Sequence, residues 1–80
     1  MLSYALKLSG RYDGMVMATI PDVPEAMAIG RDDQEAYEEA RGALEAALES
    51  YEAEGRPFPE PRTAGSLQVS TERFGMLTSA

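Results

Sequence analysis

The segment from residue 32 to residue 54 constrains the fold most, because its apolar residues recur with the spacing of one face of an α-helix. Asp32 precedes Glu35 by three residues, which is the spacing of a capping box with aspartate as the N-cap. Gly55 is a residue type that commonly ends helices. The sequence therefore predicts a helix over residues 32–54 that covers a sheet with its apolar stripe. The stripe consists of Ala36, Tyr37, Ala40, Leu44, Ala47, Leu48 and Tyr51.

The predicted helix also carries most of the charge of the protein. The 80-residue chain has 14 acidic and 7 basic residues, and its net charge is −7. Residues 32–54 contain nine acids and one base, Arg41, so their net charge is −8 and the rest of the chain carries +1. This charge argues against unaided binding of nucleic acid, in which Lys and Arg neutralise phosphates. The acids are expected to form either a solvated helix face or a docking surface for a basic partner.

Composition also excludes several kinds of site. Cysteine and histidine are both absent, which excludes disulfide bonds, thiol catalysis and histidine general bases. No apolar run reaches the roughly 20 residues that a membrane-spanning helix needs. We therefore expect a cytoplasmic protein with no metal and no cofactor, and a chain of this length suffices for one small domain over residues 1–80.

Three short segments before the helix have the features of strands joined by turns. Residues 3–9 alternate between apolar and polar side chains, as in a strand with one buried face. Residues 10–14 contain an Asp-Gly pair and predict a hairpin loop that leads into a second strand over residues 15–20. The connector at residues 21–24 contains two prolines and cannot be a central strand. A third strand is expected at residues 26–30.

The second predicted strand is apolar on both faces, whereas one helix can cover only one face of a sheet. Met15 and Met17 lie on the face that the helix leaves uncovered. We therefore expect a homo-oligomer, most simply a two-fold dimer, formed through this face and the C-terminal tail. The alternative is that the tail folds back over its own sheet. The candidate self-association residues are Met15, Met17, Phe74, Met76 and Leu77.

The chain after the helix is expected to be extended and then to form a last strand. Residues 56–62 contain three prolines, and Phe58 among them is expected to lie against the core. Residues 67–70 predict a fourth strand within a C-terminal strand or arm over residues 63–80. The sequence thus predicts an α+β fold with the order strand, strand, strand, helix, strand.

Four motifs in this order are similar to those of one known family. They are YDG at residues 12–14, PDVP at residues 21–24, GRDDQEAYEEA at residues 30–40 and EGRPFPEP at residues 54–61. Together they resemble the N-terminal domain of HicB-like antitoxins, from the HicA/HicB toxin-antitoxin pairs, over about residues 3–62. Glu25, Arg31 and Asp32 depart from the residues usual in that family, although Asp caps a helix as well as Thr does.

The resemblance implies a trimmed ribonuclease H-like fold, in which the fourth strand lies beside the first and parallel to it, giving the sheet order 3-2-1-4. It also implies an antitoxin that caps HicA, a small basic ribonuclease that cleaves messenger RNA. The DNA-binding domain that many HicB-like chains carry is not expected here. For Asp22 and Glu25, formation of the turn is the alternative role. The candidate partner-binding residues are Asp22, Glu25, Glu38, Glu39, Glu45, Glu49 and Glu52.

Two other functions stay open at this point. The chain could be a solitary HicB-like oligomerising domain with a different partner or none. A HicA-like gene next to its own gene would favour the antitoxin, and the absence of one would favour the solitary protein. A ribonuclease H-like fold also invites a metal-dependent nuclease, in which carboxylates hold paired magnesium ions. Residues 3–9 and 67–70 contain no acid, however, so we expect no enzyme and no catalytic residue.

Overall fold

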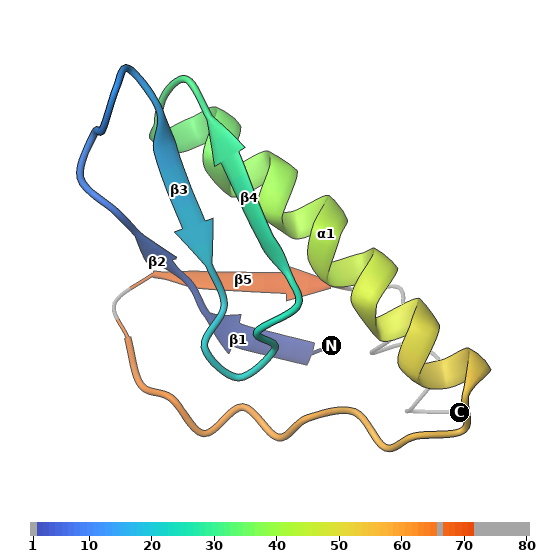
Figure 1. The fold of residues 1–80 in the computed structure, drawn as a ribbon. Coiled ribbons are helices and arrows are strands. Elements are labelled where there is room, and N and C mark those ends of the chain that lie inside the picture. The colour runs from blue at the N-terminus through green and yellow to red at the C-terminus, as the bar shows by residue number, and fades with distance from the viewer. Residues whose placement is uncertain (1, 66, 72–80) are drawn as a thin grey trace.

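The computed structural model describes residues 2–65 and 67–71, which form an α+β fold with two antiparallel sheets and one helix (Figure 1). The three-stranded sheet has the order β2-β3-β4, and β1 pairs with β5 in a second sheet. The helix α1 packs along the three-stranded sheet and has its most extensive contacts with β4. The elements are β1 (Leu2–Ala5), β2 (Lys7–Leu8), β3 (Val16–Thr19), β4 (Met27–Gly30), α1 (Asp33–Ala53) and β5 (Gln68–Thr71).

The ends of α1 lie where the capping residues predict them. The Asp32 carboxylate accepts a hydrogen bond of 2.8 Å from the Glu35 N–H. The Glu35 carboxylate accepts a hydrogen bond of 2.9 Å from the N–H of Arg31, the residue before the N-cap Asp32. In a regular capping box the donor would be the N–H of the N-cap residue itself. At the other end Gly55 has a φ of 70°, the left-handed conformation that commonly terminates a helix. The predicted helix over residues 32–54 is confirmed.

The buried stripe of α1 also agrees with the prediction, and it packs on one face of the three-stranded sheet. The end of β4 approaches the helix so closely that a Cβ on Gly30 would collide with the backbone of Ala36. A glycine is therefore required where the sheet meets the first turn of the helix. The fully buried helix residues are Ala36, Ala40, Leu44 and Leu48, and the facing residues include Val16, Ala18, Ile20 and Val23.

The hairpin predicted at residues 10–14 is confirmed. Tyr12 and Met15 exchange two backbone hydrogen bonds of 2.8 and 2.9 Å. Asp13 and Gly14 between them have φ values of 55° and 76°. Two successive residues with positive φ form the two-residue turn that Asp-Gly pairs favour. The strands that follow, β3 and β4, fall within the predicted ranges.

The strand predicted over residues 3–9 is divided at Leu6 into β1 and β2, which belong to different sheets. The expected alternation fails here, because Tyr4, Ala5 and Leu6 are buried in succession. The Leu6 N–H donates a hydrogen bond of 3.0 Å to the C=O of Leu67, just before β5 begins. Leu6 is thus the point at which the chain exchanges one neighbour, β5, for another, β3.

The predicted parallel pairing of the first and last strands is wrong, because β5 runs antiparallel to β1. The single four-stranded sheet of order 3-2-1-4 is not found among the described residues either. The path of residues 56–65, which we call the return segment, explains the direction of β5. Figure 1 shows this segment crossing the width of the molecule before β5 starts. It arrives at the C-terminal end of β1, where Gln68 pairs with Ala5, so β5 must run back along β1.

The return segment is held against the domain at several points. The Tyr4 hydroxyl donates a hydrogen bond of 2.7 Å to the C=O of Pro59. Phe58 packs against the core, as predicted. Thr63 donates two hydrogen bonds to Asp22 in the connector between β3 and β4. The proline-rich stretch is therefore an ordered part of the domain.

The predicted residues of the C-terminal tail, Phe74, Met76 and Leu77, lie outside the described residues. Within residues 2–65 and 67–71, no helix combines the length and the apolar character that crossing a membrane requires.

Candidate binding surfaces

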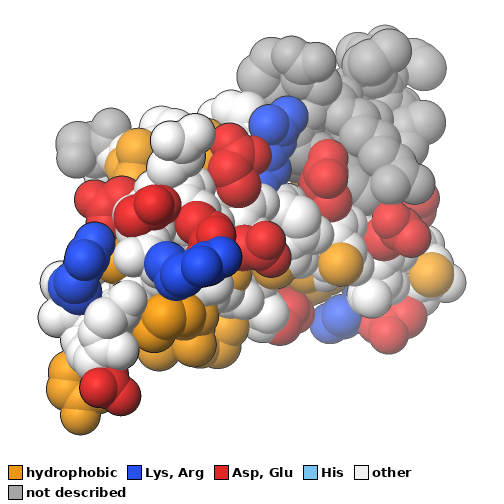
Figure 2. Space-filling view, turned by 90° about the horizontal axis from the view of Figure 1, so that it is seen from above, with side chains coloured by type: hydrophobic (Ala, Val, Ile, Leu, Met, Phe, Trp, Pro, Cys, Tyr) orange, Lys and Arg blue, Asp and Glu red, His pale blue; other side chains and the backbone are white. Residues whose placement is uncertain are grey.

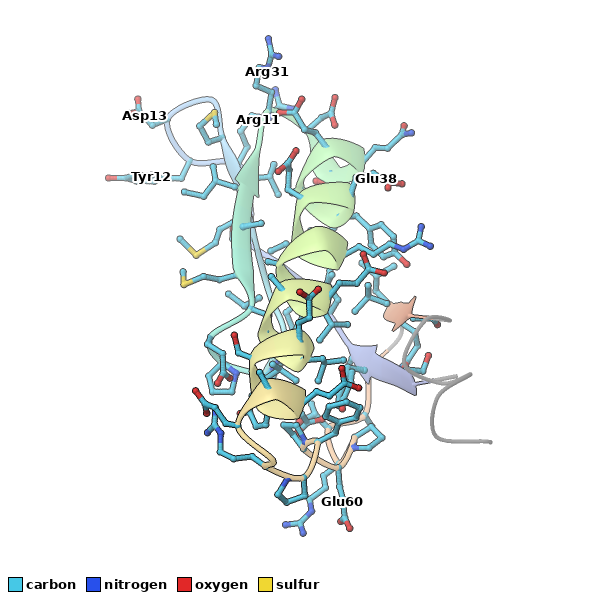
Figure 3. The ribbon with its side chains drawn as sticks, turned by 90° about the vertical axis from the view of Figure 1, so that its right-hand side faces the viewer. Arg11, Tyr12, Asp13, Arg31, Glu38 and Glu60 are labelled. Atoms are coloured by element: carbon cyan, nitrogen blue, oxygen red, sulfur yellow. The ribbon has the colours of Figure 1, made fainter. Side chains whose placement is uncertain are left out.

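Four glutamates form a row on the side of α1 that faces away from the sheet. Their spacings of seven, four and three residues place them on one face of the helix. Figure 3 shows Glu38 on this side, and Figure 2 shows a face of the molecule on which carboxylates are gathered with basic side chains among them. We call this row the acidic strip, and it consists of Glu38, Glu45, Glu49 and Glu52.

Three members of the acidic strip, Glu38, Glu45 and Glu52, take part in no salt bridge within the part of the chain that the structure describes, although Arg41 lies between Glu38 and Glu45 on the same helix face. The salt bridges there pair Arg31 with Glu35, Arg56 with Glu54 and Arg62 with Glu60. None of them includes Glu38, Glu45 or Glu52. Carboxylates on successive turns of one helix face repel one another. A cationic surface placed over the strip would relieve this repulsion.

The other three predicted partner-binding residues do not join the strip. Glu39 follows Glu38 by one residue, so it points about 100° away from it around the helix axis. Asp22 and Glu25 lie in the connector between β3 and β4, and each accepts hydrogen bonds from a residue of the protein itself. The structure thus brings together four of the seven candidates.

Asp22 ties the connector to the return segment. Its two carboxylate oxygens accept hydrogen bonds from the N–H and the hydroxyl of Thr63, at 2.8 and 2.9 Å. The bond from the Thr63 N–H is the main cause that lowers the pKa of Asp22, because it stabilises the charged form. The Thr63 hydroxyl and Arg62 act in the same direction, and partial desolvation opposes them. Asp22 therefore has a structural role that its position in a turn did not reveal.

Glu25 ties the connector between β3 and β4 to the C-terminal end of α1. Its carboxylate accepts a hydrogen bond of 2.9 Å from the Tyr51 hydroxyl, and this bond is the main cause that raises the pKa of Tyr51. The Arg56 guanidinium lies 4.0 Å from the centre of the Tyr51 ring, in a cation–π contact. Arg56 also pairs with Glu54 at 2.7 Å. Glu25 thus belongs to a cluster at the helix end, away from Glu38.

The outer face of the three-stranded sheet, which points away from α1, is apolar and exposed. Met17 pairs with Ile29 across β3 and β4, and Met27 lies on the same face two residues before Ile29. Met15 and Met17 are each 38% exposed, Met27 is 50% exposed and Ile29 is 52% exposed. Figure 3 shows Tyr12 projecting from the hairpin on this side. We call Tyr12, Met15, Met17, Met27 and Ile29 the apolar sheet face.

The prediction that the helix leaves Met15 and Met17 uncovered is confirmed, and the structure adds Tyr12, Met27 and Ile29 to this face. In β4 the side chains alternate, with Ala28 packed against the core and its neighbours Met27 and Ile29 exposed. This alternation was present in the sequence. It identifies a face only once the register of β4 against β3 is known.

The carboxylates do not gather into a metal site in the described ranges, where no three acidic side chains lie close enough together to hold one ion. No protein-family model matches the chain, and a search of curated proteins gives no match. The chemistry of the acidic strip and of the apolar sheet face is therefore what indicates a function.

Proposed function

We propose that this chain is a non-catalytic, HicB-like protein of the antitoxin type, which caps a small basic mRNA-cleaving toxin of the HicA kind in the cytoplasm. The observation that carries the proposal is the acidic strip. Three of its members, Glu38, Glu45 and Glu52, have no salt-bridge partner in the described part of the chain. These three carboxylates can therefore pair with a cationic partner.

A row of carboxylates on a rigid helix suits a partner that itself binds RNA. Such a partner presents Lys and Arg side chains to phosphates. The strip extends from Glu38 to Glu52, which is about 21 Å along a helix that rises 1.5 Å per residue. It can meet several basic side chains at once and occupy them in place of RNA. This mechanism needs no catalytic group on the chain proposed here.

The same electrostatics predict how the complex forms. Complementary charge mainly accelerates encounter, and exposed charges are screened over about 8 to 10 Å at moderate ionic strength. Association with the toxin should therefore slow steeply as salt is added, while dissociation changes less. A complex that forms equally fast at low and high salt would exclude the acidic strip as its basis.

We further propose that the fold is a variant of the HicB-like arrangement. The order of the elements supports this if β1 and β2 are counted as two halves of one first strand. The variant departs from the expected arrangement at its last strand, which is reversed.

The test measures how well the protein inhibits RNA cleavage by a HicA-type toxin encoded beside it. We expect the combined variant Glu38→Gln, Glu45→Gln and Glu52→Gln to bind the toxin about tenfold more weakly, since three exposed charge pairs of about 0.5 kcal/mol each are lost. Because the changed side chains are exposed or half-buried, the fold should be retained. Circular dichroism of the variant checks this.

The control is the combined variant Asp13→Asn, Glu54→Gln and Glu60→Gln, which changes the net charge equally but away from the strip. It should retain most of the inhibition. An equal loss in both variants would show that net charge matters and the strip does not. Cleavage of RNA by the protein alone would contradict a non-catalytic role.

A further inference from the structure

We infer that the apolar sheet face is a self-association surface, on which a second copy of this chain packs to form a two-fold dimer. The inference is independent of toxin binding, because it concerns the opposite side of the molecule from the acidic strip. Figure 3 shows the two sides, with Tyr12 directed away from the sheet on one and Glu38 beyond the helix on the other.

The apolar sheet face is continuous and almost free of charge. Its methionines and Ile29 are neighbours along and across β3 and β4. Lys7, which pairs with Thr19 in the register of β2 and β3, is the one charged side chain that the three described strands place on this face. Contiguous exposed apolar side chains of this kind mark interaction sites, because covering them removes apolar surface from water.

The shape of the face suits a copy of itself. A hollow of about 260 Å³ opens between the hairpin and the strands. Beside it Tyr12 stands out from the surface and is 83% exposed. A two-fold axis presents the same projections and the same hollow on both sides of an interface. Unbranched methionine side chains can adjust to fill the remaining gaps. The hollow is lined by Ser9, Gly10, Tyr12, Met15, Met17 and Ile29.

The distribution of charge favours a second copy as the occupant, bound through the sheet face and not through the helix. Residues 32–54 carry a net charge of −8 and the rest of the chain +1. Contact through two helices would therefore be strongly repulsive. Contact through two sheet faces places the sheets about 10 Å apart and both acidic strips on the outside, beyond two screening lengths of about 8 to 10 Å. A basic partner would find no carboxylate among the five side chains of the apolar sheet face.

This arrangement has a salt dependence opposite to that of toxin capture. Each subunit has a net charge of −7, so added salt screens the repulsion between two copies and favours the dimer. The same salt weakens an association that depends on the acidic strip. The two proposals can therefore fail separately.

The experiment measures the mass of the full chain in solution by light scattering over a range of concentrations, at low and at high salt. We expect the mass to rise from 8.7 kDa towards twice that value, and to rise at lower concentration when salt is high. Met17→Glu should weaken the dimer by at least about tenfold, since it places two carboxylates in an apolar interface. Met27→Glu is a second variant at a more exposed position.

The matched control is Ala46→Glu, which adds the same charge at an exposed position on α1. It should leave the dimerisation constant within about twofold of wild type. A mass of 8.7 kDa under all conditions would overturn the inference, as would a dimer that Ala46→Glu weakens and Met17→Glu does not. A monomer that Met17→Glu destabilises would also overturn it, because the face would then be covered by the protein's own chain.

Discussion

The strands of the two sheets are held in place by different kinds of contact, one kind in each sheet. The strands β2, β3 and β4 follow one another along the chain, and α1 buries its apolar stripe directly on them. The strands β1 and β5 come from opposite ends of the described chain, with Leu2 paired to Thr71. Tyr4 of β1 also donates a hydrogen bond to the C=O of Pro59 in the return segment, and the Leu6 N–H donates one to the C=O of Leu67.

The difference lies in what must form first. Contacts that are near in sequence close short loops, whereas pairing of β1 with β5 closes a loop of most of the chain and costs more entropy. We therefore expect the second sheet to form after the first sheet and α1. Substitutions in the first sheet should unfold the whole protein, and those at the return segment should act locally.

The largest effect is expected for Leu44→Ala, at the centre of the stripe that α1 packs on the sheet. Leu44 is fully buried, so the substitution removes buried methylenes and leaves a cavity, and it should cost about 2 to 5 kcal/mol of unfolding free energy. Chemical denaturation measures this. Glu38→Gln on the opposite side of α1 should change it by less than about 0.5 kcal/mol. If the two variants are equally stable, α1 does not hold the first sheet together.

The next largest effect is expected for Gly30→Ala, where β4 meets the first turn of α1. The added Cβ would collide with the backbone of Ala36, which cannot rotate away as a side chain could. We expect a loss of about 1 to 3 kcal/mol, as for other overpacked sites. Gly42→Ala is the matched control, since no atom outside the neighbouring helix backbone lies within 4 Å of its added Cβ and alanine favours a helix. It should stabilise the protein by about 0.5 to 1 kcal/mol, so the same substitution should have opposite signs at the two sites.

The contrast between the sheets also explains which parts of the fold could be predicted from the sequence. The helix over residues 32–54 and the hairpin at residues 10–14 depend on local spacing and on turn chemistry, and both were predicted. The break at Leu6 and the direction of β5 were not. They depend on Leu67 and on the path of the return segment, which no local pattern encodes.

The candidate binding residues also divide into those that local spacing predicts and those whose contacts depend on distant residues. The acidic strip follows from helical periodicity, and the same periodicity separates Glu39 from it. Asp22 and Glu25 were grouped with the strip because of their charge. Their actual partners, Thr63 and Tyr51, are 41 and 26 residues away in the sequence. Only the tertiary structure shows that these carboxylates are already occupied.

A smaller effect is expected for Tyr4→Phe, which keeps the buried ring but removes the hydroxyl that bonds the C=O of Pro59. One hydrogen bond contributes about 0.5 to 1.5 kcal/mol net, so the global loss should be of that size. Hydrogen exchange should become faster at the amides of Leu6 and Thr63 and change little in α1. Tyr12→Phe, at an 83% exposed ring, is the control. Equal acceleration throughout α1 would show that the two sheets unfold as one unit.

The smallest effect, and the one that depends on pH, concerns the bond between Asp22 and Thr63. The folded state lowers the pKa of Asp22 below its ordinary value of 3.8, chiefly because the Thr63 N–H donates to the carboxylate. A lowered pKa means that the charged form stabilises the fold. This contribution is complete above pH 3.8 and is lost as the pH falls through the lower, folded value. Asp22→Asn lacks the charge at every pH.

Asp22→Asn should accordingly be less stable than wild type at neutral pH, and the difference should shrink as the pH falls below 3.8. The effect should be modest, because an asparagine oxygen can still accept one bond from Thr63. Thermal unfolding of both proteins across this pH range measures the difference. Asp13→Asn removes the same charge at the hairpin without touching Thr63, and it serves as the control. If the difference in stability between wild type and Asp22→Asn instead stays constant down to the lowest pH measured, the charge of the Asp22 carboxylate does not hold the return segment. The return segment would then be held by the hydrogen bond from Tyr4 to Pro59 and by the packing of Phe58.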